Sequence, residues 1–360
     1  MDVEDLEPAG TVDLDELERA ARERLGQGLY DYVAGGAGDE LTLADNLAAW
    51  RRLRLRPRVL RDVARIDTAA TVLGTPLAAP ILVAPTGYHQ LLHPEGEAAT
   101  AAGAAAAGSL MVVSTQANRP LEEVAAAAPA APRWFQVYVH VDRPFTEELV
   151  GRAAAAGYRA LVLTADLPVL GDRLRDAHNQ FRFPPGMVLG NAAGRFGAEG
   201  VDVVAHASRF SPSVTPETVA WLRRVSGLPV LVKGVLRGDD AAACADAGAV
   251  GVVVSNHGGR QLDGAVATAD ALAEVVAAVA GRVEVYVDGG LRRGADVLKA
   301  LALGARGVLV GRPVLWGLAT GGAEGVAAVL RSLRRELALA MALCGATGLA
   351  DLTPDLVAGA

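Results

Sequence analysis

Short apolar runs recur along the chain, and most are followed by a longer Ala/Leu-rich stretch of helical character. Strands that are apolar on both faces and alternate with helices are typical of a parallel sheet. Eight such units predict closure into a (β/α)8 barrel, the TIM-barrel architecture. The predicted strands are Ile81–Pro85, Leu110–Ser114, Trp134–Val139, Ala160–Asp166, Pro229–Gly234, Val250–Asn256, Glu284–Gly290 and Gly307–Pro313.

Two segments depart from this alternation. Asp13 and Glu16 have the spacing of a capping box, and apolar residues at helical spacing follow, which predicts an N-terminal helical arm over about residues 1–70. The interval after the fourth strand is too long for one connection, so we expect a lid loop over about residues 174–214. No linker composition separates these parts, and residues 1–360 are predicted to form a single domain.

Composition narrows the class of protein. Of 360 residues 51% are hydrophobic, enough for a sizeable core, and the formal net charge of −7 argues against a nucleic-acid binder. Cys244 and Cys344 form neither a spaced metal pair nor a disulfide framework, which fits a reducing compartment. The acidic N-terminus lacks a signal-peptide pattern, and no charge-free apolar run reaches the ~18–20 residues of a membrane span. We expect a cytoplasmic protein with no nucleic-acid or membrane partner.

Polar side chains stand at the ends of nearly all the predicted strands. In such barrels the carboxyl ends of the strands carry the chemistry, and a purely structural barrel has no reason to place polar groups there so often. The residues at these ends are Thr86, Ser114, Gln136, Tyr138, Thr164, Asp166, Lys233, Ser255, His257, Arg260, Asp288, Gly311 and Arg312.

Glycine turns and arginines follow the last two strands, in Asp288–Gly294 and Gly311–Pro313. Barrels bind phosphate at this place through backbone N–H groups and a helix N-terminus. Arg292 or Arg293, and Arg312, can add charge-assisted contacts. Tight turns alone would also explain the glycines, but the two motifs together favour a phosphate. No GxGxxG motif links a strand to a helix, so a Rossmann dinucleotide site is not supported.

Lys233 ends an apolar strand and is expected to be buried. A buried, unpaired ammonium group is costly, so it should face an anion or an electron-rich group. Beside a phosphate-bearing aromatic cofactor, it can stabilise the negative charge of the reduced ring. Ser114, Gln136 and Thr164 then suit the polar edge of a flavin, although each alone is commonly a turn residue.

A histidine and an arginine, His257 and Arg260, follow the sixth strand on glycine-rich backbone. The histidine is a core residue, a metal ligand or a general base. The metal interpretation is weak, because His89 and His93 are the nearest pair and lack a third ligand. Asp166 can orient the imidazole of a base, and the planar fork of Arg260 matches a carboxylate. A base, a carboxylate clamp and a flavin together predict oxidation of a substrate carbon next to a carboxylate.

The chain resembles the FMN-dependent α-hydroxy-acid oxidase and dehydrogenase family, which includes glycolate and lactate oxidases, mandelate dehydrogenases and hydroxymandelate oxidases. The resemblance covers almost the whole chain from YDYVAGGAGDE onward. The motifs that carry it are SNHGGRQLDG (Ser255–Gly264), APTGYHQLLHPEGE (Ala84–Glu97), FQVYV (Phe135–Val139), LTADLPVLGDRLRD (Leu163–Asp176) and VDGGLRRGADVLKALALGA (Val287–Ala305).

The resemblance implies a role for each matching residue. It makes His257 the catalytic base, Asp166 its partner, and Tyr138 a hydrogen-bond partner of the substrate hydroxyl. The implied substrate-binding residues are Tyr32, Tyr138, Arg173, His257 and Arg260. The implied FMN-binding residues are Pro85, Thr86, Gly87, Ser114, Gln136, Thr164, Lys233, Ser255, Asp288, Gly289, Gly290, Arg292, Gly311 and Arg312.

The implied activity is oxidation of an L-(S)-2-hydroxy acid to the 2-oxo acid (EC 1.1.3.-). We hypothesise that His257 removes a proton while two electrons pass to the flavin, by hydride transfer or through a carbanion. O2 is the expected acceptor and H2O2 the product. Because family members are usually tetramers or octamers, we also expect a homo-oligomer.

Three positions bear on the substrate. Gly87 stands where members similar to glycolate oxidase have Ala, and Gln116 where glycolate oxidase has a bulky aromatic residue, which would enlarge the pocket. Tyr88 resembles the hydroxymandelate oxidase version of its loop. We therefore expect an aryl substrate, mandelate or 4-hydroxymandelate. The alternatives are a lactate- or glycolate-type oxidase, a monooxygenase, and a dehydrogenase with another acceptor.

Two further classes rank lower. An FMN-dependent isomerase would need a diphosphate pocket in place of His257, Arg260 and Arg173. A non-catalytic flavin protein would have no need of these three residues.

Overall fold

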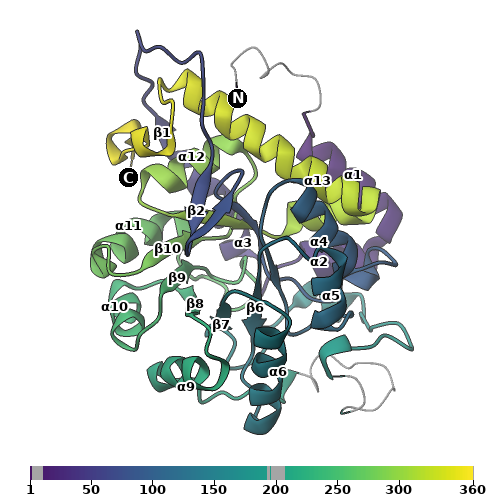
Figure 1. Ribbon diagram of the computed structural model, residues 1–360. Coiled ribbons are helices and arrows are strands. Elements are labelled where there is room, and N and C mark those ends of the chain that lie inside the picture. The colour runs from purple at the N-terminus through teal and green to yellow at the C-terminus, as the bar shows by residue number, and fades with distance from the viewer. Residues whose placement is uncertain (2–10, 193–194, 196–206, 360) are drawn as a thin grey trace.

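Eight parallel strands close into a barrel in the computed structural model, which describes residues 1, 11–192, 195 and 207–359 (Figure 1). Each strand pairs with the strands before and after it in the chain, and the last pairs with the first. The strands are β4 (Ile81–Val83), β5 (Met111–Val113), β6 (Arg133–Val137), β7 (Leu161–Thr164), β8 (Val230–Val235), β9 (Gly251–Val254), β10 (Glu284–Val287) and β11 (Gly307–Val310). The predicted (β/α)8 barrel is confirmed.

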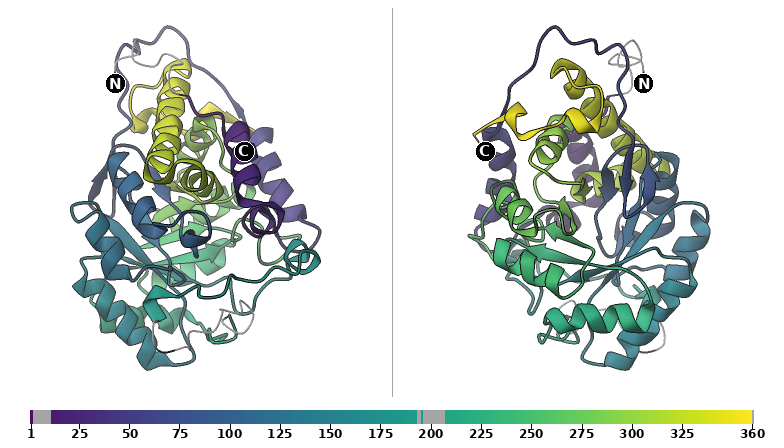
Figure 2. Two further views of the ribbon diagram at one scale, coloured as in Figure 1. Left: turned by 90° about the vertical axis from the view of Figure 1, so that its right-hand side faces the viewer. Right: turned by 60° about the vertical axis from the view of Figure 1, so that its left-hand side comes forward.

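Helices form a layer outside the strands, as the two turned views show (Figure 2). Among the described residues, two helices follow β7 and one follows each of the other barrel strands, and three more make up the arm before the barrel. The helices are α1 (Leu14–Leu25), α2 (Gln27–Ala34), α3 (Leu41–Arg52), α4 (Glu97–Ala106), α5 (Leu121–Ala127), α6 (Arg143–Ala155), α7 (Leu174–His178), α9 (Pro216–Ser226), α10 (Gly238–Asp246), α11 (Thr268–Val279), α12 (Gly294–Ala302) and α13 (Arg312–Leu343).

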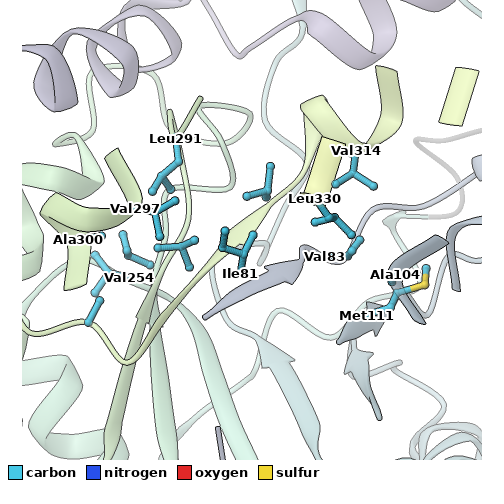
Figure 3. Packing of buried hydrophobic residues seen from close by; sticks show 14 of the residues in the cluster. Ile81, Val83, Ala104, Met111, Val254, Leu291, Val297, Ala300, Val314 and Leu330 are labelled. Atoms are coloured by element: carbon cyan, nitrogen blue, oxygen red, sulfur yellow. The ribbon is translucent and has the colours of Figure 1, made fainter. Parts of the chain in front are cut away.

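Successive residues of each strand point alternately to the two faces of the sheet, and both faces are buried. Ile81, Val83 and Val254 pack outward against helix residues such as Val297 and Val314 (Figure 3). The alternate positions of all eight strands form a separate cluster, which is the interior of the barrel. This cluster contains Leu82, Val112, Trp134, Val162, Leu231, Val253, Tyr286 and Leu309. Because these side chains fill the interior, a ligand has room only at the mouth.

The N-terminal arm begins where the sequence predicts. Asp13 caps α1, because its Oδ1 accepts hydrogen bonds from the backbone N–H groups of Asp15 (2.9 Å) and Glu16 (3.3 Å). The helix then packs against α13 (Figure 1). Two short antiparallel pairs complete the molecule. They are β1 (Arg54–Leu55) with β12 (Val357–Ala358), and β2 (Ala70–Val72) with β3 (Thr75–Leu77).

The predicted lid lies between β7 and α9, and its first part is tied to the arm. Arg175 in α7 forms ion pairs with Asp31 (3.2 Å) and Glu40, and the Asn179 amide donates to Asp31 (2.8 Å). A 3-10 helix (Gly190–Ala192) follows. Lid residues 193–194 and 196–206 lie outside the described residues.

Helix α13 is long and apolar enough to span a membrane by length and composition alone. Two thirds of its most apolar window is buried inside the molecule, against α4 and α12 among others. Gly322 has φ of 56° and interrupts its helical geometry. These features are typical of a helix packed in a core.

Candidate active site

A cavity opens at the mouth of the barrel, and most of the predicted site residues line it. The polar side chains at the strand ends converge there because the carboxyl ends of parallel strands meet at one face. The predicted residues that line it are Tyr32, Pro85, Thr86, Gly87, Ser114, Tyr138, Arg173, Lys233, His257, Arg260, Asp288, Gly289, Gly290, Arg292, Gly311 and Arg312. Gln136, Asp166 and Ser255 are not part of this lining and contact it through hydrogen bonds, and Thr164 bonds to Gln136.

His257 and Asp166 form a buried hydrogen-bonded pair. The Nδ1 of His257 lies 2.9 Å from Oδ1 of Asp166, and only 18% of the imidazole is exposed. His257 has φ of 59° and continues into Gly258 and Gly259, which are also left-handed, so the backbone turns sharply after β9. Since Asp166 engages Nδ1, Nε2 is the nitrogen available to a ligand.

The electrostatics of this pair suit a base. Burial lowers the pKa of His257 below its usual value, although the Asp166 carboxylate opposes the shift. Burial acts to raise the pKa of Asp166, but the nearby His257 and Lys233 outweigh it and the net pKa is lowered. At neutral pH the pair is therefore a neutral imidazole beside an ionised carboxylate.

Two half-buried arginines, Arg173 and Arg260, line the same cavity. Burial and repulsion from Arg173 lower the pKa of Arg260 to about 10. Arg260 lies over the Tyr32 ring (5.5 Å) and donates to the Gly35 carbonyl (2.8 Å), whereas Nε of Arg173 has no partner in the described chain. Two half-buried cations that repel each other favour an anionic ligand, and their planar forks match a carboxylate.

Tyr32, which is buried, and Tyr138, which is half-buried, add two phenols to the lining of this cavity. Burial raises the pKa of both, although Arg173 and Arg260 oppose the shift, so both stay protonated and able to donate. Their rings are held by stacking, Tyr32 on Phe181 (4.6 Å) and Tyr138 on Phe210 (4.4 Å).

The other end of the cavity is built for a phosphate. The backbone N–H groups of Gly289, Gly290 and Gly311 have no acceptor in the described part of the chain. Arg292 and Arg312 lie half-buried at the same end, and desolvation, together with Arg260 and Arg292, lowers the pKa of Arg312. Free donors and mutually repelling cations are what a bound phosphate would satisfy.

Local packing explains the residue types at this end. Gly290 has φ of 78°, and a Cβ there would lie 2.1 Å from the Asn46 carbonyl, so only glycine fits against α3. The sequence leaves open whether Arg292 or Arg293 meets the phosphate. Arg292 lines the cavity, whereas Arg293 begins α12 and lies 3.5 Å from Glu336, so the structure favours Arg292.

Arg312 also ties several loops together. Its guanidinium donates to the carbonyls of Val33 (3.0 Å), Gly35 (2.8 Å) and Gly258 (3.0 Å). The end of α2 and the His257 turn are thereby linked to the phosphate end of the cavity.

Lys233 lies between the two ends and is 4% exposed. Its Nζ donates to Oγ of Ser255 (2.8 Å) and pairs with Asp288 (3.2 Å), whose Oδ1 has no partner in the described chain. Burial acts to lower the pKa of Lys233, but Asp288 and Asp166 outweigh it, and the pKa is raised. A permanent cation therefore faces the cavity, as expected beside an aromatic ring that gains negative charge.

A row of polar groups continues from β5 to β7. Oγ of Ser114 donates to Oε1 of Gln136 (3.1 Å), and Nε2 of Gln136 donates to Oγ1 of Thr164 (2.9 Å). Together with Lys233 and the phosphate end, this row fits a flavin mononucleotide. Gln136 and Thr164 would contact the flavin through Ser114, or directly after a small movement of their side chains.

Several lining residues were not predicted as site residues. Phe210 and Ala207 come from the lid, and Leu167 and Leu170 come from the segment between β7 and the lid. Gln116 was noted only for its size. A Cβ on Gly87 would lie 2.7 Å from Cβ of Gln116, so the missing methyl at 87 is coupled to the close approach of Gln116.

Known proteins resemble this chain over nearly its full length. A family described as FMN-dependent dehydrogenase matches residues 21–359. The L-lactate oxidase of Nostoc sp. is 50% identical over 351 residues (95% of this chain, 96% of the relative), and human 2-hydroxyacid oxidase 1 is 45% identical over 353 residues (96% and 95%).

A solved structure has the same fold. Mandelate oxidase with (S)-4-hydroxymandelic acid superposes with a TM-score of 0.89 at 45% identity, covering 95% of this chain and 97% of that one. The resemblance seen in the motifs is thus confirmed, and FMN is the cofactor. The chain belongs to the family of FMN-dependent α-hydroxy-acid oxidases and dehydrogenases.

Proposed function

We propose that the protein oxidises an (S)-2-hydroxy acid to the 2-oxo acid and passes the electrons to O2, giving H2O2. One observation carries the proposal. His257, paired with Asp166 (2.9 Å), and the half-buried arginines Arg173 and Arg260 line one cavity, and the other end of that cavity fits FMN.

The chain's own residues account for binding and proton transfer. Arg173 and Arg260 hold the substrate carboxylate, and the Tyr138 hydroxyl donates to the substrate oxygen. His257 Nε2 accepts the proton that leaves the substrate, and the Asp166 carboxylate stabilises the imidazolium that forms. When bound, FMN supplies the two-electron acceptor next to the substrate.

The cavity favours an aryl side chain. Aromatic and apolar residues line it beside the clamp, and the mandelate oxidase structures share this fold. These lining residues are Tyr32, Tyr88, Leu92, Tyr138, Leu167, Leu170, Ala207 and Phe210. Lactate is the second candidate, because the Nostoc L-lactate oxidase is 50% identical to this chain.

The test is anaerobic addition of (S)-mandelate, (S)-lactate or glycolate to the purified yellow protein. We expect loss of the oxidised flavin absorbance with mandelate, and one H2O2 per 2-oxo acid when air is admitted. A monooxygenase would release a decarboxylated acid instead of peroxide, and a dehydrogenase would keep its flavin reduced in air. If none of these acids bleaches the flavin, the proposed function is wrong.

Replacing Asp166 by Asn should lower kcat/KM and move the acid limb of its pH profile. In the wild type the limb should lie below the ordinary histidine value of about 6.5, because burial lowers the pKa of His257. Asp166 raises that pKa, so its loss moves the limb to still lower pH. The plateau should fall roughly 10- to 100-fold, since a hydrogen bond to a charged group contributes about 1.5–3 kcal/mol.

The matched control is Asp172→Asn, on an exposed carboxylate of the same loop. Its pH profile should match that of the wild type. An Asp166→Asn limb that stays in place or moves to higher pH would contradict the pairing of these two residues.

A further inference from the structure

Gln116 lines the cavity and carries a buried amide nitrogen without a hydrogen-bond partner in the described chain. The residue is 7% exposed, lies just after β5 and lines the cavity. Its Oε1 accepts a hydrogen bond from the Tyr88 hydroxyl (2.8 Å), and its Nε2 has no partner in the described chain. A buried polar atom without a partner is costly, so a ligand that satisfies it gains affinity.

This conclusion does not depend on which way the amide is turned. The Tyr88 phenol can donate to Oε1 or accept from Nε2, because a hydroxyl does both. Turning the amide over therefore leaves Oε1 free instead of Nε2. In either orientation one amide atom of Gln116 is left without a partner beside the cavity.

The amide is held firmly in place. The Gln116 backbone N–H donates to Oγ of Ser114 (3.0 Å), and its carbonyl accepts from the backbone N–H of Tyr88 (3.1 Å). Gly87 packs so closely that a Cβ would lie 2.7 Å from Cβ of Gln116, and Phe183 packs on the Tyr88 ring (4.5 Å). A fixed, unsatisfied group discriminates between ligands better than a mobile one.

A continuous wall connects this amide to the carboxylate clamp. Arg260 lies over the Tyr32 ring (5.5 Å), and Tyr32 meets Tyr88 edge to face (6.5 Å). Tyr88 in turn binds Gln116. A substrate whose carboxylate is held at Arg260 would thus extend its side chain along two aromatic rings toward Gln116.

We propose that Gln116, oriented by Tyr88, binds a hydroxyl at the far end of the substrate's side chain. The preferred substrates are then 2-hydroxy acids with a second hydroxyl remote from the carboxylate, such as one on an aryl ring. A hydroxyl suits the site because it can donate or accept, and so it matches either amide orientation. This inference rests on the proposed function and specifies its substrate class.

The test compares kcat/KM for (S)-4-hydroxymandelate and (S)-4-methylmandelate, which have nearly the same shape, with (S)-mandelate as reference. The wild type should prefer the hydroxyl over the methyl compound by about 10- to 100-fold. Gln116→Met keeps the length of the side chain and removes its polar atoms. In this variant the ratio should fall to about 1, while oxidation of the methyl compound changes only a few-fold.

Tyr88→Phe is the second variant, and it keeps the aromatic wall while removing the group that orients the amide. Its hydroxyl-to-methyl ratio should fall several-fold below that of the wild type, with the FMN content and flavin spectrum unchanged. If the hydroxyl-to-methyl ratio of Tyr88→Phe equals that of the wild type, the orienting role of Tyr88 is wrong. This variant also keeps the inference testable if Gln116→Met does not fold.

The inference and the proposed function fail differently. Oxidation of mandelate or lactate without a hydroxyl preference, or a preference that survives Gln116→Met, would overturn the inference alone. If none of the 2-hydroxy acids reduces the flavin, both fall together.

Discussion

Replacement of His257 by Gln should slow flavin reduction by about 10²–10⁴-fold and leave FMN bound. Glutamine can still reach Asp166, which lies 2.9 Å from Nδ1 in the wild type, but it cannot take up a proton. The substrate clamp is untouched, so binding should change little. The measurement is the rate of flavin bleaching after rapid anaerobic mixing with (S)-mandelate.

Two controls separate chemistry from backbone strain. His257 has φ of 59°, a region that Asn adopts more readily than Gln, so His257→Asn tests whether the backbone alone explains the loss. Both variants should be equally slow. His178→Gln, on an exposed histidine of α7, should reduce its flavin at the wild-type rate. Near-normal turnover in His257→Asn would show that another group is the base.

The barrel follows from the sequence because its strands are buried on both faces. Runs such as Val252–Val254 show no polar position, since the outward residues meet helices and the inward ones fill the barrel. The predicted strands run past the observed ends, for example to Asn256 instead of Val254, because polar residues leave the ladder to form the mouth.

The strand-end rule also finds most of the polar groups that gather at the cavity, because parallel strands deliver their carboxyl ends to one face. It cannot tell a lining residue from a supporting one. Gln136, Thr164 and Ser255 do not line the cavity; Gln136 and Ser255 bond to the lining residues Ser114 and Lys233, and Thr164 bonds to Gln136. That distinction depends on which way each loop turns after its strand, and side-chain type does not encode it.

The pattern of apolar and polar residues along the sequence does not predict contacts between distant segments. Phe210 reaches Tyr138 only because the chain returns from the lid, and Asp31 pairs with Arg175 across 144 positions of sequence. The coupling of Gly87 to Gln116 is of the same kind, because it is a close approach of two neighbouring loops. Such contacts shape the substrate pocket, which is why substrate choice is harder to predict than the reaction.

Arg173→Met should lower kcat/KM for (S)-mandelate by roughly 30- to 5000-fold. Removing one partner of a buried, hydrogen-bonded charge pair costs about 2–5 kcal/mol, and every 1.4 kcal/mol is tenfold. Arg260 would be left to hold the carboxylate alone. Arg173→Lys keeps the charge but not the planar fork, so it should recover only part of the loss. Steady-state kinetics of the FMN-loaded variants measure both effects.

Mandelamide, the uncharged amide of the same acid, tells electrostatic binding from a structural effect. It has no carboxylate, so Arg173→Met should impair its oxidation far less than that of mandelate. The preference for acid over amide should therefore collapse in the variant. Removing Arg173 also relieves the repulsion that lowers the pKa of Arg260, so the remaining arginine should stay charged and able to bind an anion. Equal losses for acid and amide would mean that Arg173 supports the lid and does not hold the substrate.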